Sequence, residues 1–243
     1  MKLLAFDTST EQLSIAVRHG DRTWMHTGAG GAQASAALIP AVLALLAQAQ
    51  LTPGELDAIV FGRGPGSFTG LRTACSVAQG LAFGARPGGG VPVLPVDTLM
   101  AVAEEARLQR GATNVLALLD ARMNEVYGAA YTWSADSGWR PVDEISAGKP
   151  EQLVLPAGDD GGEGGAWVLA GNAWAAYGER FPAALDGLPR IDALPTANAL
   201  LSLAPALLAA GRAVAADQAL PLYIRDKVAQ TTAERAAAAE SRN

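Results

Sequence analysis

The sequence of 243 residues fits one large domain or two lobes of about 100–120 residues each. Half of the residues are hydrophobic and the formal net charge is −6, so a full core is possible and non-specific binding to nucleic acid or to an anionic membrane is disfavoured. The single Cys75 excludes an internal disulfide, and no apolar run reaches the ~20 residues of a membrane span. The apolar run after Met1 is too short for a signal peptide, so we expect a cytoplasmic protein.

The first half of the chain predicts three strands followed by alternating helices and strands. The expected strands cover residues 3–7, 12–18, 23–26, 57–61 and 91–96, and the expected helices cover 32–50, 71–84 and 98–107. Pro40 interrupts the first helical pattern, so it should lie in the first turn or cause a kink. The order β-β-β-α-β-α-β matches the lobe of ribonuclease-H-like and actin-like folds.

The second half repeats this opening, because Leu116–Asp120 resembles Leu3–Asp7: both are apolar runs that end in aspartate. Further strands are expected over 126–128, 129–133, 139–145 and 167–170, with a flexible glycine-rich loop over 156–166 and a helix that ends at Gly211. A repeat near half the chain length predicts two related lobes. We therefore expect an α/β protein with two ribonuclease-H-like lobes of the actin-like fold, in which helices flank mixed β-sheets. The predicted divisions are 1–105, 106–230 and a flexible tail, 231–243.

A glycine-rich turn joins the predicted strand 57–61 to the helix that follows. Its glycines, which allow unusual backbone angles or a close approach, are Gly62, Gly64, Gly66 and Gly70. Leu71 follows the last glycine where a phosphate-binding P-loop needs Lys, and the spacing does not fit a dinucleotide fingerprint. The turn suits an anion at the helix N-terminus or a packed neighbour, and the pattern alone favours neither.

Two aspartates, Asp7 and Asp120, end equivalent predicted strands. One interpretation is a magnesium–nucleotide site in the cleft between the lobes, with Thr8, Gly64 and Gly66 as further candidates. This site would make the protein an ATP- and magnesium-dependent enzyme of the actin or sugar-kinase class. The favoured alternative is that both carboxylates accept hydrogen bonds from their own turns.

Other catalytic chemistry has little support in the sequence. The two histidines, His19 and His26, have no further metal-ligating residues nearby, which makes a metallopeptidase a weak third hypothesis. Cys75 falls within an apolar helical pattern, so we interpret it as a packed core thiol. No catalytic residue or metal site is therefore predicted, and two alanine-rich helices remain as candidates for binding a partner protein.

A recognisable pattern extends over six segments: Leu4–Thr10, Gly62–Arg72, Ala78–Ala82, Asp120–Tyr127, Gly171–Asn172 and Leu220–Arg225. In these segments the chain resembles the TsaB (YeaZ) family of bacterial tRNA threonylcarbamoyladenosine biosynthesis proteins. The resemblance implies an actin-like fold and a non-catalytic scaffold beside TsaD, the paralogue that transfers threonylcarbamoyl to adenosine 37 of tRNAs that read codons starting with A. TsaD holds the catalytic metal through a His-x-x-x-His motif, which this sequence lacks. The cofactors of the complex, threonylcarbamoyl-AMP, ATP and a metal, would belong to the partner subunits.

The resemblance also implies how the subunits assemble. The two helices of the first lobe would join TsaD in a four-helix bundle, TsaE would dock on the pair, tRNA would be contacted only indirectly, and the same helices would form a homodimer when TsaD is absent. The implied partner-binding residues are Ser35, Leu38, Ile39, Val42, Leu45, Leu46, Thr69, Leu71, Arg72, Cys75, Ala78 and Gln79. Leu38→Asp or Val42→Asp would then disrupt association more than folding. Family members usually carry His-Ser where this chain has Ala34-Ser35, so a polar contact there is in question.

Overall fold

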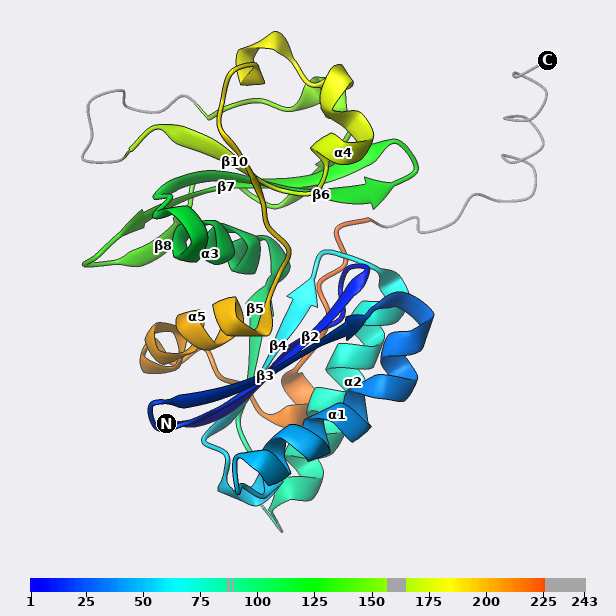
Figure 1. The fold of residues 1–243 in the computed structure, drawn as a ribbon, viewed down its shortest axis with the longest axis vertical. Helices are drawn as coiled ribbons and strands as arrows, with labels where there is room; N and C mark the ends of the chain where they lie inside the picture. Colours follow the sequence, from blue (N-terminus) through cyan, green and yellow to red (C-terminus); the bar gives the residue numbers. More distant parts are fainter. Residues whose placement is uncertain (87, 89, 157–164, 226–243) are drawn as a thin grey trace, which may run out of the picture.

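The computed structural model describes residues 1–86, 88, 90–156 and 165–225, and the chain forms two lobes, each built on one β-sheet (Figure 1). The predicted tail 231–243 and most of the predicted loop 156–166 lie outside the described residues. Within the described part of the chain, no helix is both long enough and apolar enough to span a membrane.

The first sheet has the strand order β3-β2-β1-β4-β5. Its strands are β1 (Lys2–Asp7), β2 (Gln12–His19), β3 (Arg22–Ala29), β4 (Ala58–Gly64) and β5 (Val93–Asp97). β1 pairs antiparallel with β2 and parallel with β4. Both faces of β1 are buried, as its continuous apolar run predicts, because Leu4 and Phe6 contribute to one core cluster and Leu3 and Ala5 to another.

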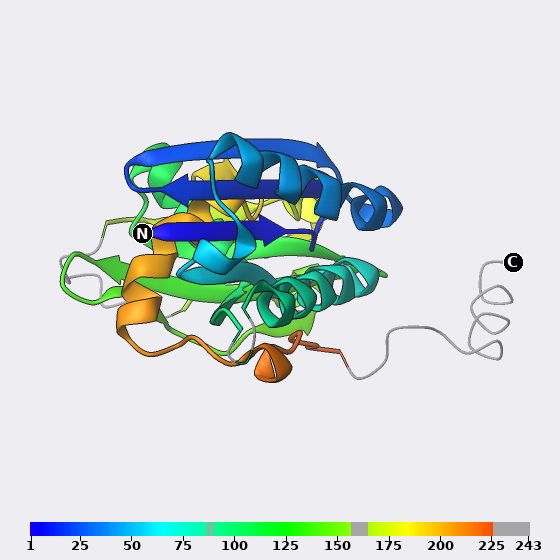
Figure 2. The same ribbon diagram turned by 90° about the horizontal axis from the view of Figure 1, so that it is seen from below.

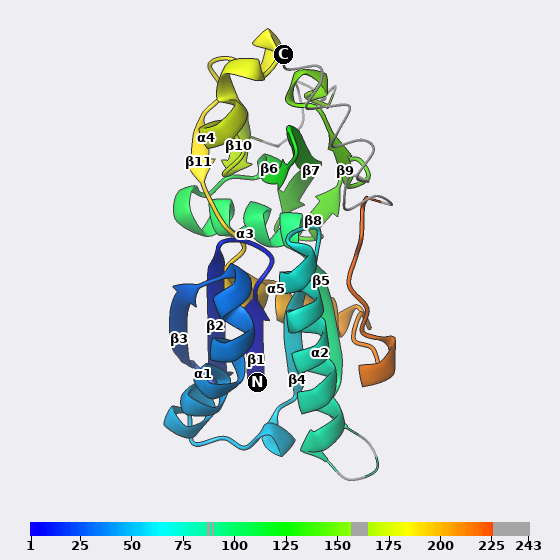
Figure 3. The same cartoon turned by 90° about the vertical axis from the view of Figure 1, so that its right-hand side faces the viewer.

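Helices cover both faces of this sheet. α1 (Ala34–Gln48) and α2 (Phe68–Ala85) lie side by side on one face (Figure 3), and α5 (Ala197–Ala209) packs on the other. The chain therefore returns to the first sheet after it has built the second. α5 lies within the range predicted for the second lobe, yet its buried side chains pack against Leu3, Ala5 and Val60 of the first sheet.

The second sheet repeats the first strand for strand, in the order β8-β7-β6-β10-β11. Its strands are β6 (Asn114–Arg122), β7 (Glu125–Ser134), β8 (Gly138–Pro141), β10 (Trp167–Gly171) and β11 (Arg190–Asp192), with β9 (Ser146–Gly148) paired to β7. α3 (Thr98–Arg110) packs on one face, and a short α4 (Trp174–Tyr177) flanks the other. The common order confirms the predicted fold class of two related lobes with mixed sheets and flanking helices.

Some predicted elements differ from the structure. Pro40 lies in the middle of α1, so of the two expectations for this residue the place in the first turn is wrong. α2 begins at Phe68, before the predicted start at Leu71, because the Ser67 hydroxyl accepts a hydrogen bond from the Gly70 N–H and caps the helix there. The predicted strands 126–128 and 129–133 are one strand, β7.

Candidate functional site

The first aspartate, Asp7, is fully buried at the end of β1 and hydrogen-bonds to its own turn. Its Oδ1 accepts hydrogen bonds from the Ser9 N–H at 2.8 Å and from the Ser9 hydroxyl at 2.7 Å, as the favoured interpretation predicts. Its Oδ2 has no hydrogen-bond partner among the described residues. Burial raises the pKa of Asp7 to about 6, although the bonds from Ser9 oppose the shift. This carboxyl is enclosed by the protein and has no open face toward a ligand.

The four glycines of the turn are explained by close packing. A β-carbon on Gly62 would overlap the Asp7 carboxylate, and one on Gly70 would overlap the carbonyl of Thr8, whose hydroxyl donates to the Gly70 carbonyl at 2.7 Å. A β-carbon on Gly66 would lie 2.6 Å from the Ser9 carbonyl oxygen. The Asp7–Ser9 turn therefore passes directly beneath the glycine turn, and of the two interpretations the structure supports the packed neighbour.

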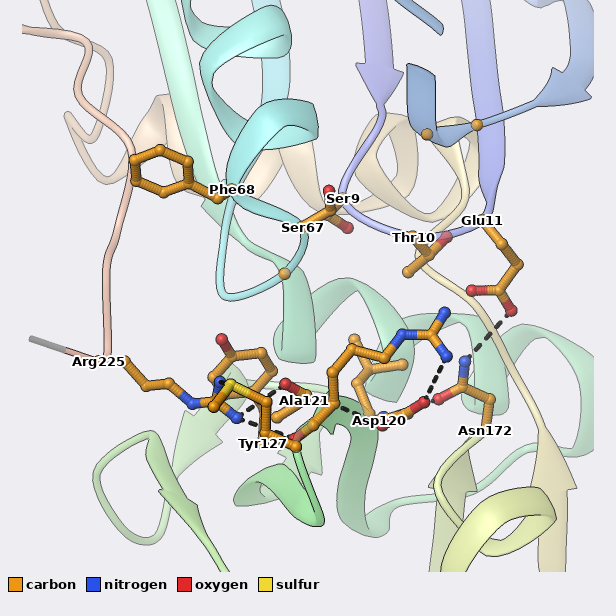
Figure 4. A pocket seen from close by; sticks show the side chains of 16 residues that line it. Ser9, Thr10, Glu11, Ser67, Phe68, Asp120, Ala121, Tyr127, Asn172 and Arg225 are labelled. Atoms are coloured by element: carbon orange, nitrogen blue, oxygen red, sulfur yellow. Dashed lines mark hydrogen bonds and ion pairs between the residues drawn. The ribbon is translucent and has the colours of Figure 1, made fainter. Parts of the chain in front are cut away.

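The second aspartate, Asp120, faces a cavity of about 460 Å³ between the lobes (Figure 4). Its Oδ1 accepts hydrogen bonds from the Arg122 N–H at 2.7 Å and from the Tyr177 hydroxyl at 2.9 Å. Its Oδ2 forms an ion pair with the Arg122 guanidinium at 3.0 Å. On the same side, the Asn172 amide donates to Glu11 of the first lobe at 3.3 Å and spans the cleft.

The candidate nucleotide residues are therefore not assembled into one site. Gly66 and Asp120 line the cavity, whereas Asp7 and Thr8 are buried below it and do not. The oxygens of Asp120 that would approach a cation are already engaged with Tyr177 and Arg122. Among the described residues, no group of three or more His, Cys, Asp or Glu side chains is placed to hold a metal ion.

No helix or strand is predicted over the segment 219–225, which we call the C-terminal strap. The Ala219 carbonyl accepts hydrogen bonds from the Cys75 thiol at 3.0 Å and from the Gln79 amide at 2.9 Å, and Figure 2 shows the segment running beside α2. Leu222 donates its N–H to the Arg63 carbonyl at 2.7 Å. Arg225 then reaches the second lobe, donating to the Ala121 carbonyl at 2.7 Å. The strap thus joins α2 to the second lobe along one side of the cleft.

The outward faces of α1 and α2 form a surface with almost no charge. α1 contains no charged residue, and the only one in α2 is Arg72. Large apolar side chains are exposed on this surface: Ile39 is 45% exposed, Leu43 50% and Phe83 81%. We call the exposed residues of these two helices the helix-pair face. Exposed apolar residues on adjacent helices with few charges are typical of a surface that another protein covers.

The twelve predicted partner-binding residues divide according to their burial. Four are exposed on the helix-pair face: Ser35, Ile39, Thr69 and Arg72. Gln79 is half-buried and bonded to the strap. Seven are buried in the core of the chain itself: Leu38, Val42, Leu45, Leu46, Leu71, Cys75 and Ala78.

Burial therefore does not support direct contact between those seven side chains and a partner. The expectation that Leu38→Asp or Val42→Asp would spare folding is corrected, since both side chains are fully buried. Leu43 and Phe83 are exposed on the helix-pair face but are not among the twelve predicted residues. Helical spacing could have identified them, because Leu43 lies on the same side of α1 as Ile39 and Phe83 on the same side of α2 as Arg72. Partner binding by the remaining residues stays a prediction.

Comparisons with known proteins agree with this architecture. A family model described as "TsaD: tRNA N6-adenosine threonylcarbamoyltransferase" matches residues 26–233. A tRNA threonylcarbamoyladenosine biosynthesis protein TsaB from Escherichia coli is 35% identical over 232 residues, which cover 94% of this chain and 96% of that protein. The TsaB of Haemophilus influenzae is 36% identical over 236 residues, covering 94% of this chain and 95% of that protein.

The solved structure of YeaZ from Pseudomonas aeruginosa superposes with a TM-score of 0.81 at 40% identity, covering 91% of this chain and 99% of that one. Agreement in sequence and in fold thus extends over nearly the whole length of these relatives. The chain belongs to the TsaB (YeaZ) family of tRNA threonylcarbamoyladenosine biosynthesis proteins.

Proposed function

We propose that this chain is a non-catalytic subunit that docks on TsaD through the helix-pair face and supports the formation of threonylcarbamoyladenosine in tRNA. The observation that carries the proposal is the pair of adjacent helices whose exposed residues are mostly apolar or small, with one charge in both helices together. Covering such a surface removes apolar area from water without desolvating many charges. The resemblance implies that TsaD is the partner, and the match of residues 26–233 to a TsaD family model supports a relationship between the two proteins.

The chain's own polar residues support a role without chemistry. The carboxylates that end β1 and β6 are hydrogen-bonded within the protein, and Asp7 is enclosed. The two histidines of the sequence are not spaced as a His-x-x-x-His motif. The similarity to a transferase family is therefore attributed to a shared fold, and the transfer step is assigned to TsaD.

In the proposed complex, TsaE would dock on the pair formed by this chain and TsaD, and the cofactors would be bound by the other subunits. A net charge of −6 disfavours direct phosphate binding, so contact with tRNA would be indirect. Threonylcarbamoyl-AMP, ATP and the metal would be held by the other subunits. The complex would work in the cytoplasm, where tRNA is modified.

Reconstitution tests the proposal. Threonylcarbamoyladenosine is measured by mass spectrometry of tRNA incubated with threonylcarbamoyl-AMP, TsaE and ATP, together with TsaD, with this chain, or with both. We expect modification with both proteins and none with this chain in place of TsaD. Size-exclusion chromatography of the mixture should show that TsaD and this chain co-elute. Transfer by this chain without TsaD, or full transfer by TsaD without this chain, would contradict the proposal.

A further inference from the structure

Arg72 is the single charged residue of the helix-pair face, and the structure holds its side chain in place. Its guanidinium carbon lies 3.8 Å from the centre of the Phe68 ring. Its Nε donates a hydrogen bond to the Tyr223 hydroxyl at 3.1 Å, and the Phe68 and Tyr223 rings lie 5.3 Å apart. Stacking and a hydrogen bond therefore fix an exposed side chain that would otherwise move freely.

The contacts of Arg72 leave the outer edge of its guanidinium available. Within the described part of the chain, only Nε is hydrogen-bonded, and the Arg72 side chain forms no ion pair. A guanidinium presents its two terminal nitrogens as a planar fork that matches the two oxygens of a carboxylate. Arg72 is thus oriented and free to donate two hydrogen bonds to one carboxylate.

Covering the helix-pair face would remove this charge from water. A buried charge without a counter-charge is costly, whereas a hydrogen-bonded ion pair largely offsets that cost. We infer that Arg72 recognises a carboxylate on the TsaD surface that covers the helix-pair face, and that it thereby favours TsaD over a second copy of this chain. This inference rests on the proposed function and adds the chemistry of the partner surface.

A second copy that docked through the same helices could not supply the carboxylate from them. α1 and α2 contain no Asp or Glu, so a symmetric helix pair brings a second Arg72 and no acid. A phosphate of RNA is also disfavoured, because phosphate contacts need clustered basic residues and this face has one. Arg72 therefore acts as a specificity residue. It strengthens binding to a partner that presents a carboxylate and weakens self-association.

The test uses the full chain and TsaD, with isothermal titration for the heterodimer and analytical ultracentrifugation for self-association. Arg72→Met keeps the apolar length of the side chain and removes the charge. We expect Arg72→Met to weaken binding to TsaD by about tenfold or more, while self-association stays equal or becomes tighter. Tyr223→Phe, which loses the hydroxyl that holds Arg72, should weaken binding by a smaller factor. Arg212→Ala, which removes an exposed arginine outside the two helices, is the matched control and should leave the affinity unchanged.

The outcomes separate this inference from the proposed function. If TsaD binds the natural chain and Arg72→Met binds as tightly or more tightly, the carboxylate contact is absent and only the inference is overturned. If TsaD does not bind the natural chain at all, both the proposed function and the inference are overturned. If Arg72→Met loses affinity for tRNA but not for TsaD, the residue binds RNA and the inference is wrong.

Discussion

The carbonyl oxygen of Leu222 lies so close to Gly64 that a β-carbon at residue 64 would approach it to 2.6 Å. Gly64 also has φ near +122°, which L-residues rarely adopt. The glycine turn and the C-terminal strap are therefore fitted to each other. The strap is therefore packed against the folded first lobe even though it follows α5.

Because of this contact between Gly64 and Leu222, we expect Gly64→Ala to lower the free energy of unfolding. The alanine meets both an unfavourable φ and the Leu222 carbonyl, and backbone strain alone costs about 1–3 kcal/mol. Urea unfolding measures the effect. The control is Gly80→Ala in α2, where nothing lies within 4 Å of the new β-carbon, so a gain of about 0.5–1 kcal/mol from helix propensity is expected. Equal free energies of unfolding for the two variants would contradict the packing of the strap on the turn.

The second prediction concerns the pH dependence of stability. The pKa of Asp7 is about 6 in the folded protein against 3.8 for the ordinary group, so the folded state holds the proton more tightly. The free energy of unfolding should therefore fall as pH rises through this window, by about 3 kcal/mol at 1.36 kcal/mol per pKa unit. Asp7→Asn removes this titration. Its free energy of unfolding relative to the natural chain should rise between about pH 4 and pH 6 and then level off, and a constant difference across that range would show that Asp7 is not buried as described.

The third prediction contrasts two leucines of α1. Leu38 is fully buried against the sheet, whereas Leu43 is 50% exposed on the helix-pair face. Leu38→Asp buries an unpaired carboxylate and should cost several kcal/mol by order of magnitude. Leu43→Asp should change the stability of the isolated chain by only about 0.5 kcal/mol. Thermal unfolding followed by circular dichroism distinguishes them, and similar melting temperatures would mean that α1 is oriented differently.

The fourth prediction addresses Glu104, which is 2% exposed where α3, α5 and β8 meet. It accepts two hydrogen bonds from Arg107, at 2.7 and 2.8 Å, one from Trp139 at 2.8 Å, and one from Ser202. Burial alone would raise the pKa of Glu104, but the bonds from Arg107, Ser202 and Trp139 together outweigh it and lower the pKa. The stability that Glu104 contributes is therefore present above its unfolded pKa and lost as pH falls through the lowered folded value.

Glu104→Ala leaves the partly buried Arg107 without its counter-charge, and we expect a loss of about 3–5 kcal/mol at neutral pH. Ser202→Ala removes one of the four hydrogen bonds and should cost about 1 kcal/mol. Denaturant unfolding at pH 7 measures both variants. A cost for Glu104→Ala no larger than that for Ser202→Ala would show that the network contributes little to holding the lobes together.

Much of the fold could be predicted from local patterns in the sequence. The alternation around Leu13 and Ile15, the apolar run before Asp7 and its repeat before Asp120 indicated the strands and the two-lobe arrangement. These signals are local, because strand period and helix caps depend on neighbouring residues. The return of α5 to the first sheet could not be predicted, since its apolar pattern does not show which of two similar sheets it covers.

The candidate site was less predictable, because it depends on which side of each helix faces the sheet and on contacts between residues far apart in the sequence. Helical spacing identified α1 and α2 as apolar nearly all round, but it could not show which side faced the sheet, so buried Leu38 was chosen and exposed Leu43 was missed. The glycines of the turn could not be assigned to a packed neighbour or to a ligand. That choice depends on contacts with Ser9 and Leu222, which lie far from the turn along the chain.

If TsaD docks on the exposed side of α1 and α2, a double variant that places two charges there, Ile39→Glu with Leu43→Glu, should lose binding when TsaD is titrated with it. Both side chains are about half exposed, so the variant should melt within about 2 °C of the natural chain. We expect saturable binding of the natural chain and no detectable binding of the variant at the same concentrations. Equal affinity of the two chains for TsaD would mean that TsaD does not dock on this surface.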